Sequence, residues 1–470
     1  MSCCRQATVQ QRSWERVRRH MLGQLACLGR HTLTGVAATT GSVFSDWSAH
    51  YRLYSRQRFD PAAVFSVVRR QMDQELQPQQ PMIVAMDDSL LRKTGPRIHG
   101  VAYRRDPLGP PFQTNLVRGQ RVLQLSAALP QSDRPEAARM IPIDFRHVPT
   151  PAKPASNAAA AQWADYHTAC RQNRISGHGL QRIAQLRHNL DQDGAEQRPL
   201  WVVVDGRFTN RTVMKKLPDR TVFIGRIRSD AKLYHLPEDS SGPLGRKKIY
   251  GPQAPTPEQL RQSEDFPWQN VPAWACGKMH DFRLKVLQPL RWRPTSDQVN
   301  VQIVVIAPLA YRLTKGGRVL YRKPAYLVCT DPDLSLQQLL QAYLWRWDIE
   351  VNFRDQKTLL GVGQAQVRNS ASTESVPALT VAAYSLLLLA AHRSLLTSSG
   401  CLPPPKWRQK TLSPKRRPSL CDLIGLLRHD LWADSIRAPH FSHFSSHSCC
   451  NQKSEKLLPS LPGALFYAPA

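Results

Sequence analysis

The chain has 470 residues, of which 41% are hydrophobic and 21% charged. These fractions are typical of folded proteins and exclude a disordered chain, while the length predicts several domains at roughly 150 residues each. The 64 Lys and Arg residues exceed the 35 Asp and Glu residues, for a net charge of +29. This surplus predicts a polyanionic partner, and its spread through segments with folded character favours nucleic acid over a ribosomal or membrane-surface role.

The ten cysteines form no repeated C-x-x-C pair and no small secreted framework. This usage favours a reducing cytosol, and the N-terminus lacks the apolar region of a signal peptide. The most apolar run, residues 376–391, is shorter than the ~20 residues that span a bilayer. We therefore expect a cytoplasmic protein with no membrane partner, in which this run is a buried core helix.

The first predicted elements are basic helices between residues 14 and 72, where apolar residues recur at spacings of three and four. Residues 1–78 are therefore expected to form a small helical DNA-binding domain, with a solvated bundle as the alternative. A strand begins at Pro81 and ends in Asp87 and Asp88, and further strands are expected up to about residue 129. Residues 130–157 are expected to be a connection, and one helix is expected over residues 160–190.

PLWVVVDGRF, from Pro199, predicts a buried strand that ends at Asp205, and another strand follows from Thr221. The expected fold is α/β, with a mixed-sheet core and a β-rich insertion after the second acid. The core takes residues 79–228 and 331–398, and the insertion takes residues 229–330. Residues 399–470 are expected to be a basic linker, one short helix at 420–431 and a largely disordered tail.

One helix is predicted from the capping residue Ser335 to Gly361. At about 100° per residue, its polar stripe spans about 60° of arc. That stripe consists of Tyr343, Arg346, Glu350 and Lys357. The expected buried stripe beside it consists of Leu336, Leu340, Leu344, Trp347 and Val351. Taken alone, Arg346 and Glu350 also fit a surface ion pair one turn apart.

Acidic residues directly after apolar strands lie at the rim of a sheet, where a metal can be held. Asp87 or Asp88 follows one such strand and Asp205 follows the other. Together with Glu350 they would form an all-oxygen site suited to Mg²⁺ or Mn²⁺. Two such ions roughly 3.5–4 Å apart would hold the attacking and leaving oxygens of a phosphodiester.

The helix motif resembles the YREK signature of a branch of the bacterial insertion-sequence DDE transposases. DDS at residues 87–89 and DGRF at residues 205–208 are similar to the two acidic motifs of that branch. The resemblance covers roughly residues 15 to 395 and implies an RNase H-like core with a β-rich insertion between the second Asp and the Glu. It also implies catalytic, metal-binding roles for Asp87 (or Asp88), Asp205 and Glu350, and alternation with Ile83 and Ala85 favours Asp87 only slightly. By the same resemblance, the phosphates of the transposon end would be bound by Tyr343, Arg346 and Lys357.

The activity implied by the resemblance is Mg²⁺-dependent cleavage at transposon ends and strand transfer into target DNA. Two metal ions are expected, Mn²⁺ can substitute, and a homodimer would hold two DNA ends in the bacterial nucleoid. Arg92 and Lys93 are predicted to contact DNA, with solvated loop charges as the alternative. A different reading is a catalytically inactive or domesticated relative that acts as a DNA-binding repressor or architectural protein, which the presence of all three acids argues against.

Overall fold

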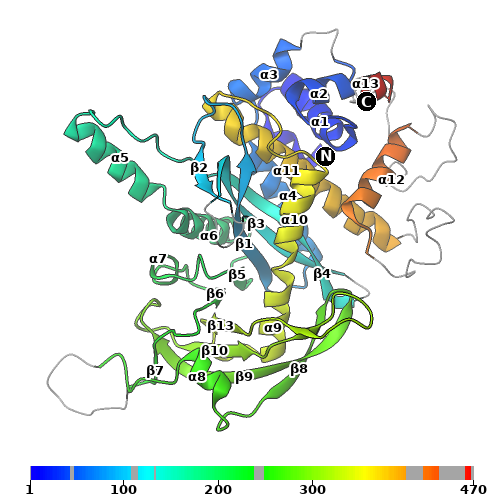
Figure 1. Ribbon diagram of the computed structural model, residues 1–470. Coiled ribbons are helices and arrows are strands. Elements are labelled where there is room, and N and C mark those ends of the chain that lie inside the picture. Colours follow the sequence, from blue (N-terminus) through cyan, green and yellow to red (C-terminus); the bar gives the residue numbers. More distant parts are fainter. Residues whose placement is uncertain are drawn as a thin grey trace.

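The computed structural model describes residues 2–42, 47–106, 109, 115–131, 134–237, 248–397, 417–432 and 461–466. A mixed sheet of 11 strands runs through the molecule, with helices against both faces (Figure 1). Its strands are β1 (Met82–Arg92), β2 (Ala102–Arg105), β3 (Leu116–Gln131), β4 (Arg134–His147), β5 (Leu200–Val204), β6 (Thr221–Arg226), β7 (Leu233–Tyr234), β8 (Gln269–Ala275), β9 (Lys278–Trp292), β10 (Val301–Ile306) and β13 (Ala325–Cys329). A separate ribbon pairs β11 (Ala310–Tyr311) with β12 (Leu320–Tyr321).

Five strands form the part of the sheet that carries the predicted acids. β4 pairs with β3 and β3 with β1, both antiparallel, whereas β5 is parallel to β1 and β6 is parallel to β5. This order is consistent with the RNase H-like core that the resemblance implies. Because β1 and β5 are parallel, the residues that follow their last paired positions meet at one edge of the sheet.

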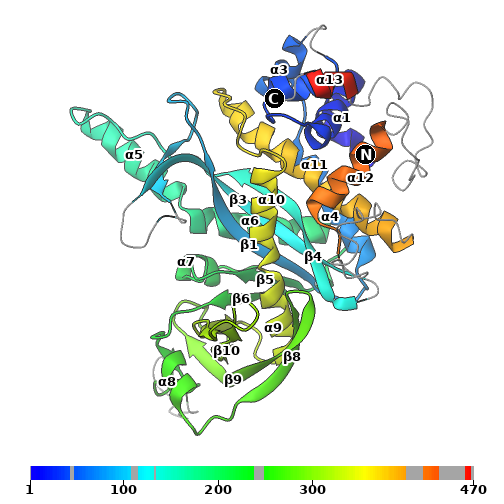
Figure 2. The same ribbon diagram turned by 45° about the vertical axis from the view of Figure 1, so that its right-hand side comes forward.

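The strands between residues 229 and 330 continue this sheet. β13 pairs with β6, and β10, β9 and β7 follow in order, while β8 pairs with β9. These strands, with α8 (Pro257–Gln262), form the lower lobe in Figure 2. The expected strands therefore exist, and all of them except the β11–β12 ribbon extend the core sheet by backbone hydrogen bonds.

The N-terminal helices predicted from apolar spacing are present. They are α1 (Gln11–Ala26), α2 (Leu33–Thr39), α3 (Ser48–Ser55) and α4 (Pro61–Glu75), preceded by the 3₁₀ helix η1 (Ser2–Ala7). Their buried apolar side chains, among them Met21 and Val68, belong to the same cluster as those of the sheet. This unit is thus packed onto the core, and its role in DNA binding stays a prediction.

The apolar run at residues 376–391 lies within α11 (Ser370–Thr397), which packs against β4 and the N-terminal helices. Among the described residues, α11 is the one helix long and apolar enough to cross a membrane, and 83% of its most apolar window is buried in the protein. The prediction of a buried core helix is therefore confirmed.

Two local predictions were wrong. Residues 134–147 form β4 and not a connection, because Pro142 falls where the β3–β4 register shifts and so costs the ladder little. The helix expected over residues 160–190 is two helices, α5 (Ala160–Gln172) and α6 (Ile175–Gln192). The Asn173 side chain ends α5 by donating to the Ala169 carbonyl at 2.9 Å. As a result, α5 projects from the body without a buried residue (Figure 1).

The C-terminal region contains the short helix that the sequence predicts. It is α12 (Leu420–Trp432), which packs against α1 and α11, and a further short helix is α13 (Leu461–Phe466). Just before α12, Arg417 pairs with Asp348 at 2.9 Å. The predicted linker and most of the predicted disordered tail, with its His and Cys residues at 440–450, lie outside the described residues.

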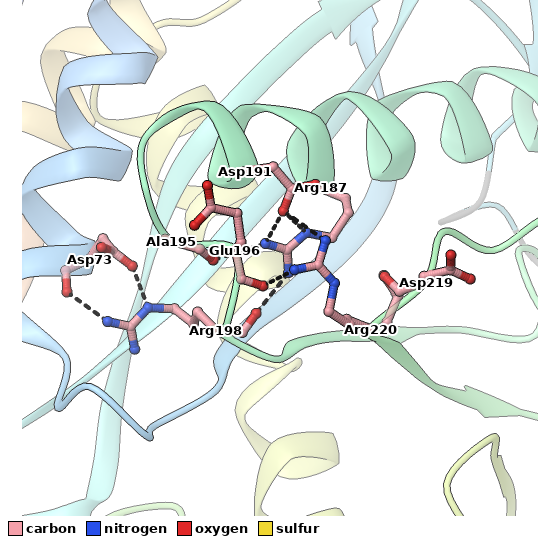
Figure 3. Close-up of polar contacts among 9 residues, drawn as sticks. Asp73, Arg187, Asp191, Ala195, Glu196, Arg198, Asp219 and Arg220 are labelled. Carbon is pink, nitrogen blue, oxygen red and sulfur yellow. Dashed lines mark hydrogen bonds and ion pairs between the residues drawn. The ribbon is translucent and has the colours of Figure 1, made fainter.

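Buried arginines fix the start of β5. Arg187 of α6 donates to the carbonyls of Arg198 and Ala195 at 2.7 and 3.0 Å, and its Nε donates to Asp191 at 2.9 Å (Figure 3). Arg198 in turn forms an ion pair with Asp73 of α4. These contacts hold the strand that carries Asp205 against both α4 and α6, so its far end has a defined position.

Candidate active site

Two of the predicted acids lie side by side at the edge of the sheet. The parallel ladder of β1 and β5 ends at Met86 and Val204, so Asp87 and Asp205 are the first residues beyond it. The pKa of Asp87 is raised to about 7, first by burial and then by the nearby charge of Asp205, while Arg346 opposes the shift. The two carboxylates therefore share a partly buried region with a deficit of positive charge.

Strand alternation separates the two members of the Asp doublet. Ile83 and Ala85 pack in the cluster that includes Ile349 and Phe353, so Asp87 continues onto the face covered by the motif helices. Asp88 points to the opposite face, where Arg121 Nε donates to it at 2.8 Å and Arg207 Nη1 lies 3.2 Å from its oxygens. The geometry thus favours Asp87 over Asp88 as the partner of Asp205.

The motif helix is interrupted, contrary to the prediction of one continuous helix. Ser335 caps α9 (Leu336–Trp345), and α10 (Asp348–Thr358) follows after a tight turn. Around this turn the amides of Trp347, Ile349 and Glu350 bond to carbonyls three residues earlier at 3.0–3.3 Å, which winds the chain more tightly than an α-helix. The chain leaves the sheet's lower part along α9 and continues along α10 (Figure 1).

The buried side chains of α9 and α10 differ from the predicted apolar stripe. Of the predicted apolar stripe only Leu340 is fully buried, and Trp347 is 58% exposed. The buried residues of the two helices are Leu339, Leu340, Gln341, Ala342, Ile349, Asn352, Phe353, Asp355 and Gln356. The helical wheel failed within α9 itself, where Leu339 and Ala342 are buried while Leu336 and Leu344 are only partly buried.

Arg346 lies between two of the predicted catalytic acids. Its Nη2 is 3.3 Å from Glu350 Oε1 and its Nη1 is 3.9 Å from Asp87 Oδ2. The guanidinium carbon is 5.8 Å from the centre of the Tyr343 ring. Arg346 is only 9% exposed, and among the described residues its Nε and Nη1 have no hydrogen-bond partner. Tyr343, Arg346 and Glu350 therefore lie close to Asp87. The Arg346 nitrogens at the centre of this group can still donate hydrogen bonds.

Lys357 joins the same helix to the first acidic motif. Its Nζ lies 2.6 Å from Oγ of Ser89, which shares a strand face with Asp87. Burial lowers the pKa of Lys357, and the charge of Arg92 adds to this shift. The ammonium group is half-buried beside the acids, and its predicted contact with a phosphate stays a prediction.

Buried amides, which the sequence analysis missed, dock α10 onto β3. Gln356 Nε2 donates to Gln124 Oε1 at 2.9 Å, and Ser126 Oγ donates to Asn352 Oδ1 at 3.0 Å. Asn352 Nδ2 also donates to the Met140 carbonyl at 3.1 Å. Gln124 is the register partner of Asp87, so these bonds set the position of Glu350 relative to Asp87. The polar residues at alternate positions of GQRVLQLS, residues 119–126, are the sequence feature that could have predicted these buried amides.

The two basic residues after the first acids have different surroundings. Lys93 is 5% exposed and its Nζ donates to the carbonyls of Gly363 and Ala365 at 2.8 and 2.7 Å. The prediction that Lys93 contacts DNA was therefore wrong, because the loop after α10 covers and satisfies it. The Arg92 side chain is 72% exposed and pairs with Asp106 at 3.0 Å. Its contact with DNA stays a prediction.

The acids fit a hard divalent cation by chemistry but require a rearrangement to hold one. Among the described residues no three Asp, Glu, His or Cys side chains are close enough together to hold a metal ion. Asp87, Asp205 and Glu350 provide only oxygen ligands, which Mg²⁺ and Mn²⁺ prefer. Because Arg346 lies between Asp87 and Glu350, their approach to a shared ion requires this side chain to move.

A comparison with known families identifies the family of the chain. The sequence model of the family described as DDE superfamily endonuclease matches residues 6–279. This range contains Asp87, Asp88 and Asp205 and ends before Glu350, so the assignment of Glu350 rests on its geometry beside Arg346. No curated protein matches the chain.

Proposed function

Because the chain belongs to the DDE superfamily of endonucleases, we propose that it is the transposase of a bacterial insertion sequence, of the YREK branch. DNA is the substrate of such an endonuclease, and the superfamily is generally metal-dependent. The proposed reaction is cleavage at the ends of the element and transfer of the freed end into target DNA.

One observation carries this proposal. The turn between α9 and α10 brings Glu350 and Arg346 to Asp87, which is the first residue of β1 beyond its parallel ladder with β5, beside Asp205. A simple surface ion pair of Arg346 and Glu350 would not require a position next to Asp87 and Asp205. Its two side chains would lie in solvent, and not where the parallel ladder of β1 and β5 ends. The grouping of acids from three separate elements supports a catalytic site.

The roles follow from charge and position. Asp87, Asp205 and Glu350 would hold the divalent ions, which when bound would supply Lewis-acid activation of the phosphodiester. Arg346 and Lys357 would bind phosphate oxygens and offset their charge, and Tyr343 would orient Arg346 through its ring. Ser89 and the amides on α10 would fix the positions of Lys357 and Glu350.

The partners follow from the reaction. Joining two element ends to one target requires two active sites, so we propose a homodimer bound to the inverted repeats and to target DNA. We place the enzyme at the nucleoid in the bacterial cytoplasm, where that DNA lies. The N-terminal helices are proposed to bind the element ends, since the net charge of +29 favours DNA over other partners.

A catalytically inactive DNA-binding relative is the second candidate. It is favoured by one feature, the position of Arg346 between Asp87 and Glu350. Such a protein would bind the element ends without cutting or joining them.

A strand-transfer assay separates the two candidates. With Mg²⁺, the wild-type protein is expected to join pre-cut duplexes, taken from the DNA that flanks its coding region, to a target plasmid. Asp205→Asn is expected to lose joining by about 10³-fold or more, because a metal ligand is removed. Gel analysis of the joined products is the measurement, and Asp219→Asn, at an acid outside the site, serves as the matched control. Binding of the ends without joining by the wild type would favour the inactive relative.

A further inference from the structure

Three arginines surround Asp88 on the sheet face opposite the candidate active site. We infer that this Asp88 cluster, defined as Asp88, Arg104, Arg121 and Arg207, binds a phosphate group of the DNA that is cut. The inference rests on the proposed function, because it adds a second DNA contact to the same edge of the sheet.

The cluster holds more positive than negative charge. Asp88 accepts a hydrogen bond from Arg121 Nε at 2.8 Å, and both of its oxygens lie 3.2 Å from Arg207 Nη1. The carboxylate is only 11% exposed, so it is committed to these two arginines. One carboxylate cannot neutralise two guanidinium groups, and Arg104 adds a further charge.

Arg104 is the unsatisfied member of the cluster. Its Nη2 donates to Oγ1 of Thr150 at 2.5 Å, and it forms no ion pair with any carboxylate that the structure describes. Its buried Nε also lacks a hydrogen-bond acceptor within the described part of the chain. A buried N–H without an acceptor is costly, and an anion would supply both the opposite charge and the acceptor that Nε lacks.

The pKa shifts of neighbouring groups agree with this surplus of positive charge. Burial lowers the pKa of Arg104, and the charges of Arg121 and Arg207 lower it further against the opposing effect of Asp88. On α6, burial lowers the pKa of His178, again with a contribution from Arg121. Cations at this edge thus repel one another, and a bound anion would relieve that repulsion.

The position of the cluster identifies the anion as a DNA phosphate. Asp88 follows Asp87 on β1, and Arg207 lies two residues after Asp205, so the cluster adjoins both proposed catalytic acids. A DNA strand carries a charge every ~3.4 Å along the helix axis, so a strand cut at Asp87 has further phosphates within reach. Guanidinium groups match phosphate geometry with paired donors. The Arg207 side chain is 53% exposed and leaves the cluster open to solvent.

The test compares single arginine changes in the full-length protein. Fluorescence anisotropy would measure the affinity for a duplex of arbitrary sequence across a range of salt concentrations. Arg104→Gln and Arg207→Gln are each expected to weaken binding about 3- to 10-fold and to lower the salt slope by about one. The matched control is Arg228→Gln, because Arg228 is an exposed arginine after β6 that pairs with Asp230 at 2.8 Å. It is expected to bind like the wild type.

Binding by Arg104→Gln and Arg207→Gln that equals the wild type, or an equal loss in Arg228→Gln, would overturn the inference. Since Arg207 is half-exposed, its variant remains informative if Arg104→Gln fails to fold. A titration with Mn²⁺ separates this outcome from failure of the proposed function, because the arginine variants are expected to retain metal binding. Absence of Mn²⁺ binding by the wild type would count against the proposed function and not against the cluster.

Discussion

Asp87→Asn is expected to weaken Mn²⁺ binding by more than about 100-fold, whereas Asp88→Asn is expected to change it by less than about threefold. Loss of groups that merely orient a metal ligand already costs roughly 10- to 100-fold in affinity, and loss of a ligand costs more. Asp87 faces Asp205 and Arg346, while Asp88 faces Arg121 and Arg207 across the sheet. Isothermal titration with Mn²⁺ is the measurement.

The two substitutions form a matched pair, since they make the same chemical change at adjacent positions of one strand. Asp88→Asn removes the charge that Arg121 and Arg207 share, so its melting temperature must be checked before its affinity is compared. If Asp88→Asn lost metal binding in a folded protein while Asp87→Asn kept it, Asp88 would be the ligand, and the assignment by strand alternation would be wrong.

Arg346→Gln is expected to bind Mn²⁺ about tenfold more tightly in the absence of DNA, and to cleave DNA more slowly. The guanidinium lies 3.3 Å from Glu350 and 3.9 Å from Asp87, so it competes with a metal ion for the same carboxylates. A charge ~4 Å away contributes a few kcal/mol near a protein surface, and tenfold corresponds to about 1.4 kcal/mol. Cleavage is expected to fall because the proposed phosphate contact is lost. Titration with Mn²⁺ and a cleavage assay on the same preparation measure these opposite effects.

Lys357→Gln is the control for charge alone. Lys357 lies on the same pair of helices, but its ammonium contacts Oγ of Ser89 and forms no ion pair with a carboxylate in the described part of the chain. Removing its charge is expected to change Mn²⁺ affinity less than about threefold. An equal gain in both variants would show that general electrostatics, and not competition at Glu350 and Asp87, sets the metal affinity.

The sequence predicted where the strands begin and how α9 is capped, because these causes are local, but β1 continues through Asp87 and Asp88 to Arg92 and does not end there. Runs of buried apolar residues form β5 and the part of β1 that precedes Asp87, and Ser335 caps α9 as expected. Gly361, with a φ of +57°, follows α10 in the left-handed conformation that glycine accommodates. These features depend on neighbours in the chain.

The remaining differences depend on tertiary contacts or on small backbone changes. Arg346 and Trp347 keep right-handed helical angles and include neither Gly nor Pro, so the turn between α9 and α10 left no sequence signal. In the sequence, Lys93 resembles an exposed loop residue. It is buried because the chain from Gly363 onward covers it and accepts its hydrogen bonds. Asp87 and Asp88 differ in the side chains that surround them, and these come from segments distant in the sequence. The folded structure therefore distinguishes the two residues.

Cleavage of duplex DNA that carries the element ends, in the presence of Mg²⁺, tests the central claim most directly. That claim is that Asp87, Asp205 and Glu350 act as one catalytic site. The wild type is expected to cut at the ends, and Glu350→Gln is expected to lose cleavage by about 10³-fold or more while its affinity for the ends stays within about twofold. Equal rates of cleavage by the wild type and Glu350→Gln would contradict the account.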